Sequence, residues 1–166
     1  MIKEITIRFV DDKEIKKFDC GNKDLNSYFI KYAKQNDSKN ISRTFVLQDE
    51  GKIVGFYTLT AAQIRCEEMP QEILKHFPRY PLPAIRIARF AIDKKFQKKG
   101  YGKQLLKFVF KRIILVSVDI GIAFVIIDAK KESKEFYEKH GFICIDESTN
   151  KYIISIKTLI KAALNN

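Results

Sequence analysis

The residues Ile92–Lys103, IDKKFQKKGYGK, join a predicted strand to a predicted helix through a loop that contains two glycines. The strand is the apolar run at residues 84–92, which is rich in Ile and Phe. Gly100 and Gly102 mark the turn, and beyond Lys103 apolar residues recur at helical spacing. The segment therefore predicts a strand, a glycine loop and the start of a helix.

This loop has the properties of an anion-binding site. The first turn of a helix presents backbone N–H groups without partners and the positive end of the helix dipole. Glycines let the backbone approach a phosphate closely, and the flanking lysines add charge, so a diphosphate is the expected ligand. The loop is not a Walker loop, because no glycine lies five residues before Gly102. It is not a dinucleotide fingerprint, because Leu105 stands where the third glycine belongs.

The positive charge of the chain is concentrated around the same loop. The 166 residues carry a net charge of +11, and residues 86–112 alone hold ten basic side chains against one acidic one. A solvated lysine-rich surface is the alternative explanation, but it would not be so localised. The charge therefore favours an anionic ligand or partner.

Composition excludes several classes of protein. Hydrophobic residues make up 46% of the chain and charged residues 31%, which excludes a disordered or collagen-like chain and predicts one domain over residues 1–166. The three cysteines form no CxxC pair and the two histidines lack metal-ligand spacing, so we expect reduced thiols and no metal site. The apolar run 113–127 is interrupted by polar residues, which predicts a cytoplasmic protein without a membrane segment.

The order of the predicted elements favours an α/β fold. A strand, a helix, a strand, a helix and a further strand follow one another in the second half, which predicts a parallel crossover. The predicted strands are residues 2–9, 44–48, 53–61, 84–92, 122–127, 142–146 and 152–156. The predicted helices are residues 24–35, 72–76, about 103–116 and 131–139, with a short helix at the end of the chain.

Three motifs resemble the GNAT superfamily of N-acetyltransferases. Gln97, Gly100 and Gly102 match the pattern [Arg/Gln]-x-x-Gly-x-[Gly/Ala], which resembles the acetyl-CoA pyrophosphate loop of that superfamily. Upstream, residues 88–93 (ARFAID) look like its fourth strand. Downstream, residues 136–142 (FYEKHGF) are close to its A-x-x-F-Y-x-x-x-G-F signature. The motifs occur in the family's order and at its spacing.

The resemblance implies a fold and a set of cofactor contacts. The implied fold is a single mixed, largely antiparallel sheet of six to seven strands flanked by helices, with acetyl-CoA in the cleft between the fourth and fifth strands. Backbone groups of the fourth strand would pair with the pantetheine arm, and the loop amides would cradle the diphosphate. The implied cofactor contacts are Phe90, Ala91, Ile92, Gln97, Lys98, Lys99, Gly100, Tyr101, Gly102, Lys103, Asp128, Ser133 and Phe136.

Tyr137 is the catalytic residue that the resemblance implies. It matches the family tyrosine whose hydroxyl meets the departing sulfur of coenzyme A. A thiol pKa of about 8.5 and a tyrosine pKa of about 10 are close enough for useful proton donation. The alternative is an aromatic side chain that only packs near the cofactor. His140 is expected to lie at a helix end, and no carboxylate or histidine stands out as a general base.

The N-terminal part resembles one branch of the superfamily. Residues 18–21 (FDCG), followed by Leu25-Asn26, look like the opening of the acetyltransferase toxins of bacterial type II toxin–antitoxin pairs. The resemblance implies acetylation of the amino group of aminoacyl-tRNA, a ribbon-helix-helix antitoxin as partner and a homodimer. One departure is Lys98, where such toxins often have glycine.

The absence of a strong base also bears on the substrate. An α-amino group with a pKa near 8 is roughly 10% neutral at pH 7, whereas a lysine amine is about 0.04% neutral. Charged tRNA offers such an amine on a polyanion. The candidate RNA contacts are Lys31, Lys34, Lys39, Arg43, Arg79, Arg86 and Arg89. The alternatives are an acetyltransferase acting on a protein N-terminus, a ribosomal protein or a small amine, and a nucleic-acid-binding module without catalysis.

Overall fold

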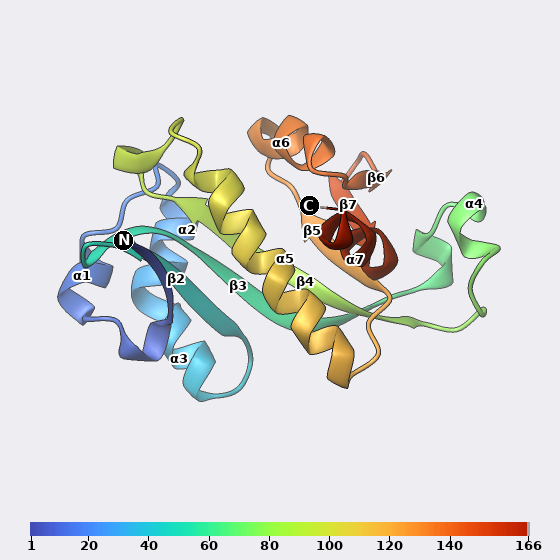
Figure 1. The fold of residues 1–166 in the computed structure, drawn as a ribbon, viewed down its shortest axis with the longest axis horizontal. Helices are drawn as coiled ribbons and strands as arrows, with labels where there is room; N and C mark the ends of the chain where they lie inside the picture. Colours follow the sequence, from blue (N-terminus) through green and yellow to red (C-terminus); the bar gives the residue numbers. More distant parts are fainter. Residues whose placement is uncertain (166) are drawn as a thin grey trace. The chain divides into compact units, whose positions relative to one another are not determined.

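The structure is a computed structural model that describes residues 1–165, and its described strands form one seven-stranded sheet (Figure 1). The strand order is β1-β2-β3-β4-β5-β7-β6. β4 and β5 are parallel, whereas β1–β2, β2–β3, β5–β7 and β6–β7 are antiparallel. The predicted mixed, largely antiparallel sheet is therefore confirmed. The strands are β1 (Ile2–Thr6), β2 (Arg43–Asp49), β3 (Lys52–Ile64), β4 (Leu82–Ile92), β5 (Phe124–Asp128), β6 (Ile143–Asp146) and β7 (Lys151–Ser155).

The helices follow the predicted order, with one short helix that the sequence prediction lacked. That helix, α1, begins where the Asp11 carboxylate accepts a hydrogen bond from the backbone N–H of Lys13 (2.9 Å). The α-helices are α1 (Asp12–Lys16), α2 (Lys23–Ser27), α3 (Ala33–Ser38), α4 (Gln71–Leu74), α5 (Tyr101–Asp119), α6 (Lys134–Lys139) and α7 (Ile156–Leu164). Short 3-10 turns cover Ile7–Phe9, Cys66–Glu68, Lys94–Phe96 and Lys131–Ser133, and Tyr28–Tyr32 is a π-helical turn.

The chain divides into two compact units. The first comprises Met1–Thr60 and Ala88–Lys111, and the second comprises Ala61–Ile87 and Arg112–Asn166.

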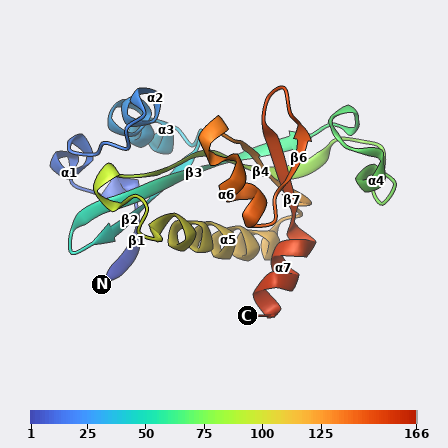
Figure 2. The same ribbon diagram turned by 90° about the horizontal axis from the view of Figure 1, so that it is seen from above.

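Three phenylalanines form the centre of the core in the first unit. Phe18, Phe29 and Phe56 are at most 3% exposed, and their ring centroids lie 4.3–5.3 Å apart. Burying each such side chain contributes about 1.5–3 kcal/mol. Figure 2 shows α1, α2 and α3 on one side of β2 and β3, and the first half of α5 on the other. Ala91, near the end of β4, belongs to the same buried cluster, so this core fixes the strand that leads into the glycine loop.

Two predicted elements of the first unit have different bounds in the structure. The strand predicted over residues 2–9 ends at Thr6, because Ile7 and Val10 turn into the core and are at most 3% exposed. The helix predicted over residues 24–35 extends to Ser38 and passes through the π-helical turn. It begins as predicted near Asn22, whose side chain accepts hydrogen bonds from the first-turn amides.

The second unit contains the parallel pairing that the sequence predicted. β4 and β5 pair from Ala84↔Phe124 to Ile87↔Ile127, and α5 lies between them in sequence, which confirms the crossover. The predicted final hairpin is also confirmed as β6 and β7. The buried face of these strands packs on the segment that contains α4, with Phe124 and Ile153 at most 2% exposed.

Candidate functional site

The glycine loop is open to solvent and ends at the N-terminus of α5. Gly100 has φ +86°, and a Cβ built there would meet no heavy atom within 4 Å. The first-turn amides of α5 have no partner within the helix, and the Gln104 N–H donates to the Gly100 carbonyl over 3.3 Å. A 19-residue helix thus presents its positive end at an uncovered backbone, which fits a diphosphate.

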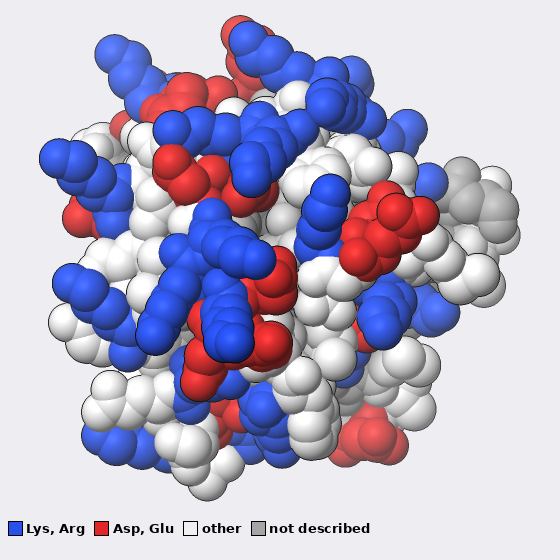
Figure 3. All heavy atoms as spheres, turned by 90° about the vertical axis from the view of Figure 1, so that its left-hand side faces the viewer, with Lys and Arg blue, Asp and Glu red and all other residues white. Residues whose placement is uncertain are grey.

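Lysines surround this backbone. Figure 3 looks onto the left-hand side of Figure 1, where α1, α2 and the loop before α5 lie. It shows many Lys and Arg side chains on that face, with Asp and Glu between them. Next to the amides, the positive charges favour an anion of two or more charges over a neutral ligand. The exposed lysines of the loop and of the first turns of α5 are Lys94, Lys95, Lys98, Lys99, Lys103 and Lys107.

Gln97 faces the protein rather than the open side of the loop. Its side-chain Nε2 donates to the carbonyl oxygens of Cys20 (2.9 Å) and Ile92 (2.8 Å). The carboxylate of Asp93, which is 6% exposed, accepts hydrogen bonds from the N–H groups of Asp19 and Lys95. The Gln97 side chain therefore ties the loop down, and the backbone that follows it remains available to a ligand.

Lys98 occupies the left-handed region with φ +60°, where a non-glycine residue is strained by about 1–2 kcal/mol. We expect Lys98→Gly to raise the thermal midpoint by about 2–4 °C, which corresponds to about 1 kcal/mol for a chain of this length. The matched control is Lys99→Gly, since Lys99 has no positive φ. That variant adds unfolded-state entropy and removes the exposed hydrogen bond from Lys99 Nζ to the Lys95 carbonyl (2.9 Å), so it should not raise the midpoint. Differential scanning calorimetry measures both. A lower midpoint for Lys98→Gly than for the unchanged protein would show that the left-handed turn is not strained.

β3 approaches the end of β4 closely. A Cβ built at Gly55 would lie 2.6 Å from the carbonyl oxygen of Ala91 and 2.7 Å from Cδ1 of Ile92. Ala91 is 6% exposed, and Phe90 and Ile92 are half-buried. Glycine at position 55 therefore leaves room for Ala91 and Ile92, which belong to the strand predicted to pair with the pantetheine arm.

Tyr137 lies in the second unit, on α6, and is 4% exposed. Its ring packs against those of Phe136 (centroids 5.2 Å apart) and Phe142 (5.5 Å). Burial raises the pKa of Tyr137 above its ordinary value, so the hydroxyl keeps its proton at neutral pH. His140 lies at the C-terminal end of α6, as predicted, where Nδ1 is 2.7 Å from the Phe136 carbonyl oxygen.

The other two predicted contacts of the second unit lie before α6. Asp128 ends β5, and its carboxylate forms an ion pair with Arg86 of β4. Ser133 belongs to the 3-10 turn that precedes α6, and its N–H donates to the Lys130 carbonyl (2.9 Å). The charge of Asp128 is thus balanced by Arg86. The position of Ser133 is set by the hydrogen bond from its backbone N–H, and no side-chain contact is needed to explain it.

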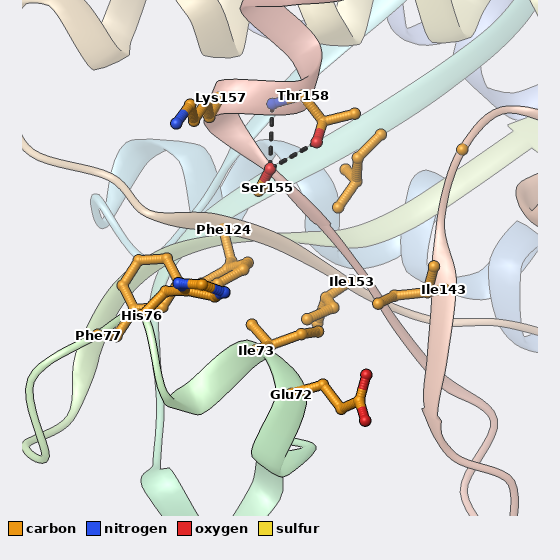
Figure 4. Close-up of a pocket in the computed structure, with 12 residues that line it drawn as sticks. Glu72, Ile73, His76, Phe77, Phe124, Ile143, Ile153, Ser155, Lys157 and Thr158 are labelled. Carbon is orange, nitrogen blue, oxygen red and sulfur yellow. Dashed lines mark hydrogen bonds between the residues drawn. The ribbon is translucent and has the colours of Figure 1, made fainter.

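A pocket of about 740 Å³ in the second unit is not lined by any of these residues. It is mainly apolar, and α4, β6, β7 and the start of α7 supply its walls (Figure 4). Ser155 at its edge caps α7 by accepting a hydrogen bond from the N–H of Thr158 (3.0 Å). The lining residues are Glu72, Ile73, His76, Phe77, Phe124, Gly141, Ile143, Ile153, Ile154, Ser155, Lys157 and Thr158.

The structure separates the seven candidate RNA contacts into two groups. Arg86 pairs with Asp128, and Lys34 donates to the Val10 carbonyl (2.7 Å) and to Asp12 (2.6 Å). Of the seven candidates, three are exposed and make no side-chain hydrogen bond or ion pair, so a phosphate could reach them without breaking an existing contact. Arg43 and Arg89 join the first group, and Lys31, Lys39 and Arg79 form the second.

Arg43 and Arg89 are held by different contacts. Arg43 Nη1 donates to the Asp37 carbonyl (2.7 Å) and its Nη2 donates to the Asn40 side chain (2.7 Å). The Arg89 guanidinium lies 4.5 Å from the ring centroid of Tyr28, a cation–π contact. The guanidinium groups of both arginines are therefore engaged in contacts within the first unit, and an RNA phosphate would have to compete with those contacts.

Metal-ligand clusters and membrane-spanning helices are absent from the part of the chain that the structure describes. No group of three or more His, Cys, Asp or Glu side chains in residues 1–165 could hold a metal ion. In the same range, no helix combines the length and the apolar character that a bilayer crossing requires.

A family profile described as "Acetyltransferase (GNAT) domain" matches residues 17–159. The chain belongs to the GNAT acetyltransferases. This confirms the family that the three motifs resembled. It makes the chain an enzyme that transfers an acetyl group, with acetyl-CoA as the donor. The matched range of the GNAT domain includes the glycine loop, β4 and Tyr137.

Characterised GNAT proteins extend the comparison. A protein named tRNA-acetylating toxin from Mycobacterium tuberculosis (strain ATCC 25618 / H37Rv) is 30% identical over 136 residues, which are 81% of each protein. The crystal structure of a point mutant of KacT has a TM-score of 0.86 at 26% identity, covering 97% of this chain and 98% of that chain.

Solved complexes of AtaT have the same fold. AtaT complexed with acetyl-methionyl-tRNAfMet has a TM-score of 0.86 at 22% identity, covering 98% of this chain and 99% of that chain. A mutant AtaT bound to the C-terminus of the antitoxin AtaR has a TM-score of 0.82 at 21% identity, covering 100% and 99%. At these identities the likeness shows the GNAT fold.

Sequence reasoning assigned no role to Asp19, Asn26 and Asp93, although all three lie in motifs that it quoted. The structure places them in hydrogen bonds that tie the start of the glycine loop to the N-terminal motif. The signal that could have found them is their residue type, because Asp and Asn side chains commonly bond to nearby backbone groups.

Proposed function

We propose that this enzyme transfers the acetyl group of acetyl-CoA to the α-amino group of aminoacyl-tRNA and so blocks translation as a toxin. The observation that carries this proposal is the 30% identity, over 81% of each chain, to a tRNA-acetylating toxin. The exposed lysines beside the glycine loop and the exposed Lys31 and Lys39 support a polyanionic acceptor.

In this proposal the chain binds the donor mainly through its backbone. The amides of Lys98–Lys103 hold the diphosphate, and the backbone of Phe90–Ile92 pairs with the pantetheine arm. Acetyl-CoA supplies an activated thioester. The acceptor nitrogen forms the new bond to the acetyl carbon, the carbon–sulfur bond breaks, and the nitrogen releases a proton to water. The Tyr137 hydroxyl donates a proton to the departing sulfur and regains one from solvent.

The acceptor chemistry follows from the absence of a strong base among the residues assigned to the reaction. His140 is engaged with the Phe136 carbonyl at the end of α6. The amine must therefore reach its neutral form unaided, which favours an α-amine with a pKa near 8 over a lysine amine of about 10.4.

The proposal extends to partners and assembly. We infer an antitoxin of the ribbon-helix-helix type, a homodimer, a cytoplasmic location and a single acetyltransferase domain over residues 1–166. The complex of AtaT with the C-terminus of AtaR supports the antitoxin as a class of partner.

The direct test is transfer of a labelled acetyl group from acetyl-CoA to total charged tRNA, compared with deacylated tRNA and free amino acids. Labelling of charged tRNA alone is the expected result. Equal labelling of free amino acids would overturn the tRNA assignment. An acceptor such as a protein N-terminus, a ribosomal protein or a small amine would then replace it.

The double variant Lys31→Glu/Lys39→Glu is expected to weaken tRNA binding and to leave acetyl-CoA binding unchanged. Lys31 and Lys39 are exposed and make no side-chain hydrogen bond or ion pair, whereas Lys34 donates a hydrogen bond to Asp12. Each lost phosphate contact makes the negative slope of log affinity against log salt shallower by about 0.7 on a single strand. Fluorescence anisotropy at several salt concentrations measures this slope.

The matched control for that experiment is Lys3→Glu/Lys52→Glu. Lys3 and Lys52 are exposed in the same unit, and the double variant changes the net charge by the same amount. Equal weakening by both double variants would show that net charge alone, rather than contacts at Lys31 and Lys39, attracts the tRNA.

A further inference from the structure

The N-terminal motif Phe18–Asn26 closes on itself through side-chain hydrogen bonds. Asp19 Oδ1 accepts hydrogen bonds from the Gly21 N–H (2.9 Å) and from Asn26 Nδ2 (2.8 Å). Asn26 Oδ1 accepts one from the Cys20 N–H (2.9 Å). These three bonds give residues 19–26 one defined conformation. None of these atoms belongs to the predicted acetyl-CoA contacts.

The closed motif is joined to the segment that precedes the glycine loop. The Lys94 N–H donates to the Asp19 carbonyl (2.9 Å), and the Asp19 N–H donates to the Asp93 carboxylate (3.1 Å). Gln97 Nε2 donates to the Cys20 carbonyl (2.9 Å), which anchors the last residue before the ligand-binding amides. Residues more than 70 positions apart in sequence are thus held in a fixed register by three hydrogen bonds.

An ion pair adds to this junction. Lys94 Nζ lies 2.8 Å from Asp19 Oδ2, and that hydrogen bond holds the pKa of Asp19 at about 2, so the carboxylate stays charged at neutral pH. Both side chains are half exposed, and an exposed ion pair contributes little stability. The junction therefore depends mainly on its hydrogen bonds. Its main effect is to fix the position of residues 93–97 relative to the N-terminal motif.

Geometry matters here because the loop would bind its ligand through backbone N–H groups. Such groups cannot adjust one by one, since a shift of the segment 93–97 moves every following amide together. Misplacement by about 1 Å in an active site can cost roughly a hundredfold in rate, and misplaced amides are expected to weaken ligand binding to a similar extent. We propose that Asp19 and Asn26 are positioning residues that hold the diphosphate-binding loop of this enzyme in register. This inference rests on the proposed function, because it concerns the loop assigned there to acetyl-CoA.

The test compares two acetyl donors, acetyl-CoA and S-acetylpantetheine, which lacks the diphosphate. Asp19→Ala is expected to raise the KM for acetyl-CoA by roughly tenfold to a hundredfold, with kcat changed by less than about threefold. The KM for S-acetylpantetheine is expected to stay the same, because that donor does not use the loop. Asn26→Ala should show the same pattern.

Two further variants make the test decisive. Asp19→Asn keeps the oxygen that accepts from the Gly21 N–H and loses only the ion pair and hydrogen bond with Lys94, so it should retain most of the acetyl-CoA affinity and rescue a poorly folding Asp19→Ala. Asp12→Ala removes the exposed Lys34 ion pair in the same unit and should change neither KM. An equal rise in KM for both donors, or no rise for acetyl-CoA, would overturn the positioning role.

The proposed function has its own separate outcome in this experiment. If the unaltered enzyme does not bind acetyl-CoA in a calorimetric titration, the assignment of the loop fails and the positioning role fails with it. If the unaltered enzyme binds acetyl-CoA and the variants bind it equally well, only the positioning role fails.

Discussion

Tyr137→Phe is expected to reduce the rate of acetyl transfer by roughly 10²–10⁴-fold, the usual contribution of one general acid. Acetyl-CoA affinity should stay the same, because the hydroxyl acts on a charge that forms only late in the reaction. The phenylalanine keeps the ring that packs against Phe136 and Phe142, so the fold is retained. Thiol release measures the rate, and calorimetric titration measures the affinity.

The pH dependence of the unaltered enzyme gives a second measure of the same role. Burial raises the pKa of Tyr137, so its proton is present throughout the neutral range and is lost only well above pH 10. The rate should therefore rise as an acceptor amine with a pKa near 8 loses its proton, and should then stay level up to about pH 10.

Two results would contradict this role for Tyr137. One is a variant turnover within threefold of the unaltered enzyme, and the other is a fall in rate between pH 8 and pH 10. Tyr80→Phe is the control, because Tyr80 is a tyrosine of the same unit that is 61% exposed. It should leave the rate unchanged.

Gly55→Val is expected to lower both stability and acetyl-CoA affinity. Its Cβ would lie 2.6 Å from the Ala91 carbonyl oxygen, so β3 and the end of β4 must separate locally. Overpacking of this kind costs about 1–3 kcal/mol or more, which lowers the thermal midpoint of a chain this long by several degrees. Because the displaced strand residues would pair with the pantetheine arm, affinity should fall by more than about tenfold.

The control for Gly55 is Gly121→Ala. A Cβ at Gly121 would meet no heavy atom within 4 Å, and Gly121 has no positive φ, so this variant should fold and bind acetyl-CoA normally. Calorimetry at a temperature where both variants are folded separates affinity from stability. Unchanged affinity in Gly55→Val would show that the cofactor does not use the end of β4.

The family and the local course of the chain could be predicted from the sequence. Apolar periodicity and the two glycines predicted the strand, loop and helix around Ile92–Lys103, and the structure contains all three. These features depend on residues close together in the chain, which is why a pattern in one sequence is enough to predict them. The glycine pattern and the FYEKHGF motif resemble those of the GNAT family, and the family profile confirms that resemblance.

Contacts between distant residues were decided only by the tertiary structure. The amide of Gln97 reaches the carbonyl of Cys20, 77 positions away, and Asp19 meets the carboxylate of Asp93, 74 positions away. Lys34 resembles the other lysines of its helix in sequence, but the fold brings Asp12 to it and leaves Lys31 uncommitted. No local pattern encodes such partners, because they depend on how separate elements pack. The sequence therefore predicted which groups would perform the chemistry, and the packing determined which charges and backbone atoms remain available for it.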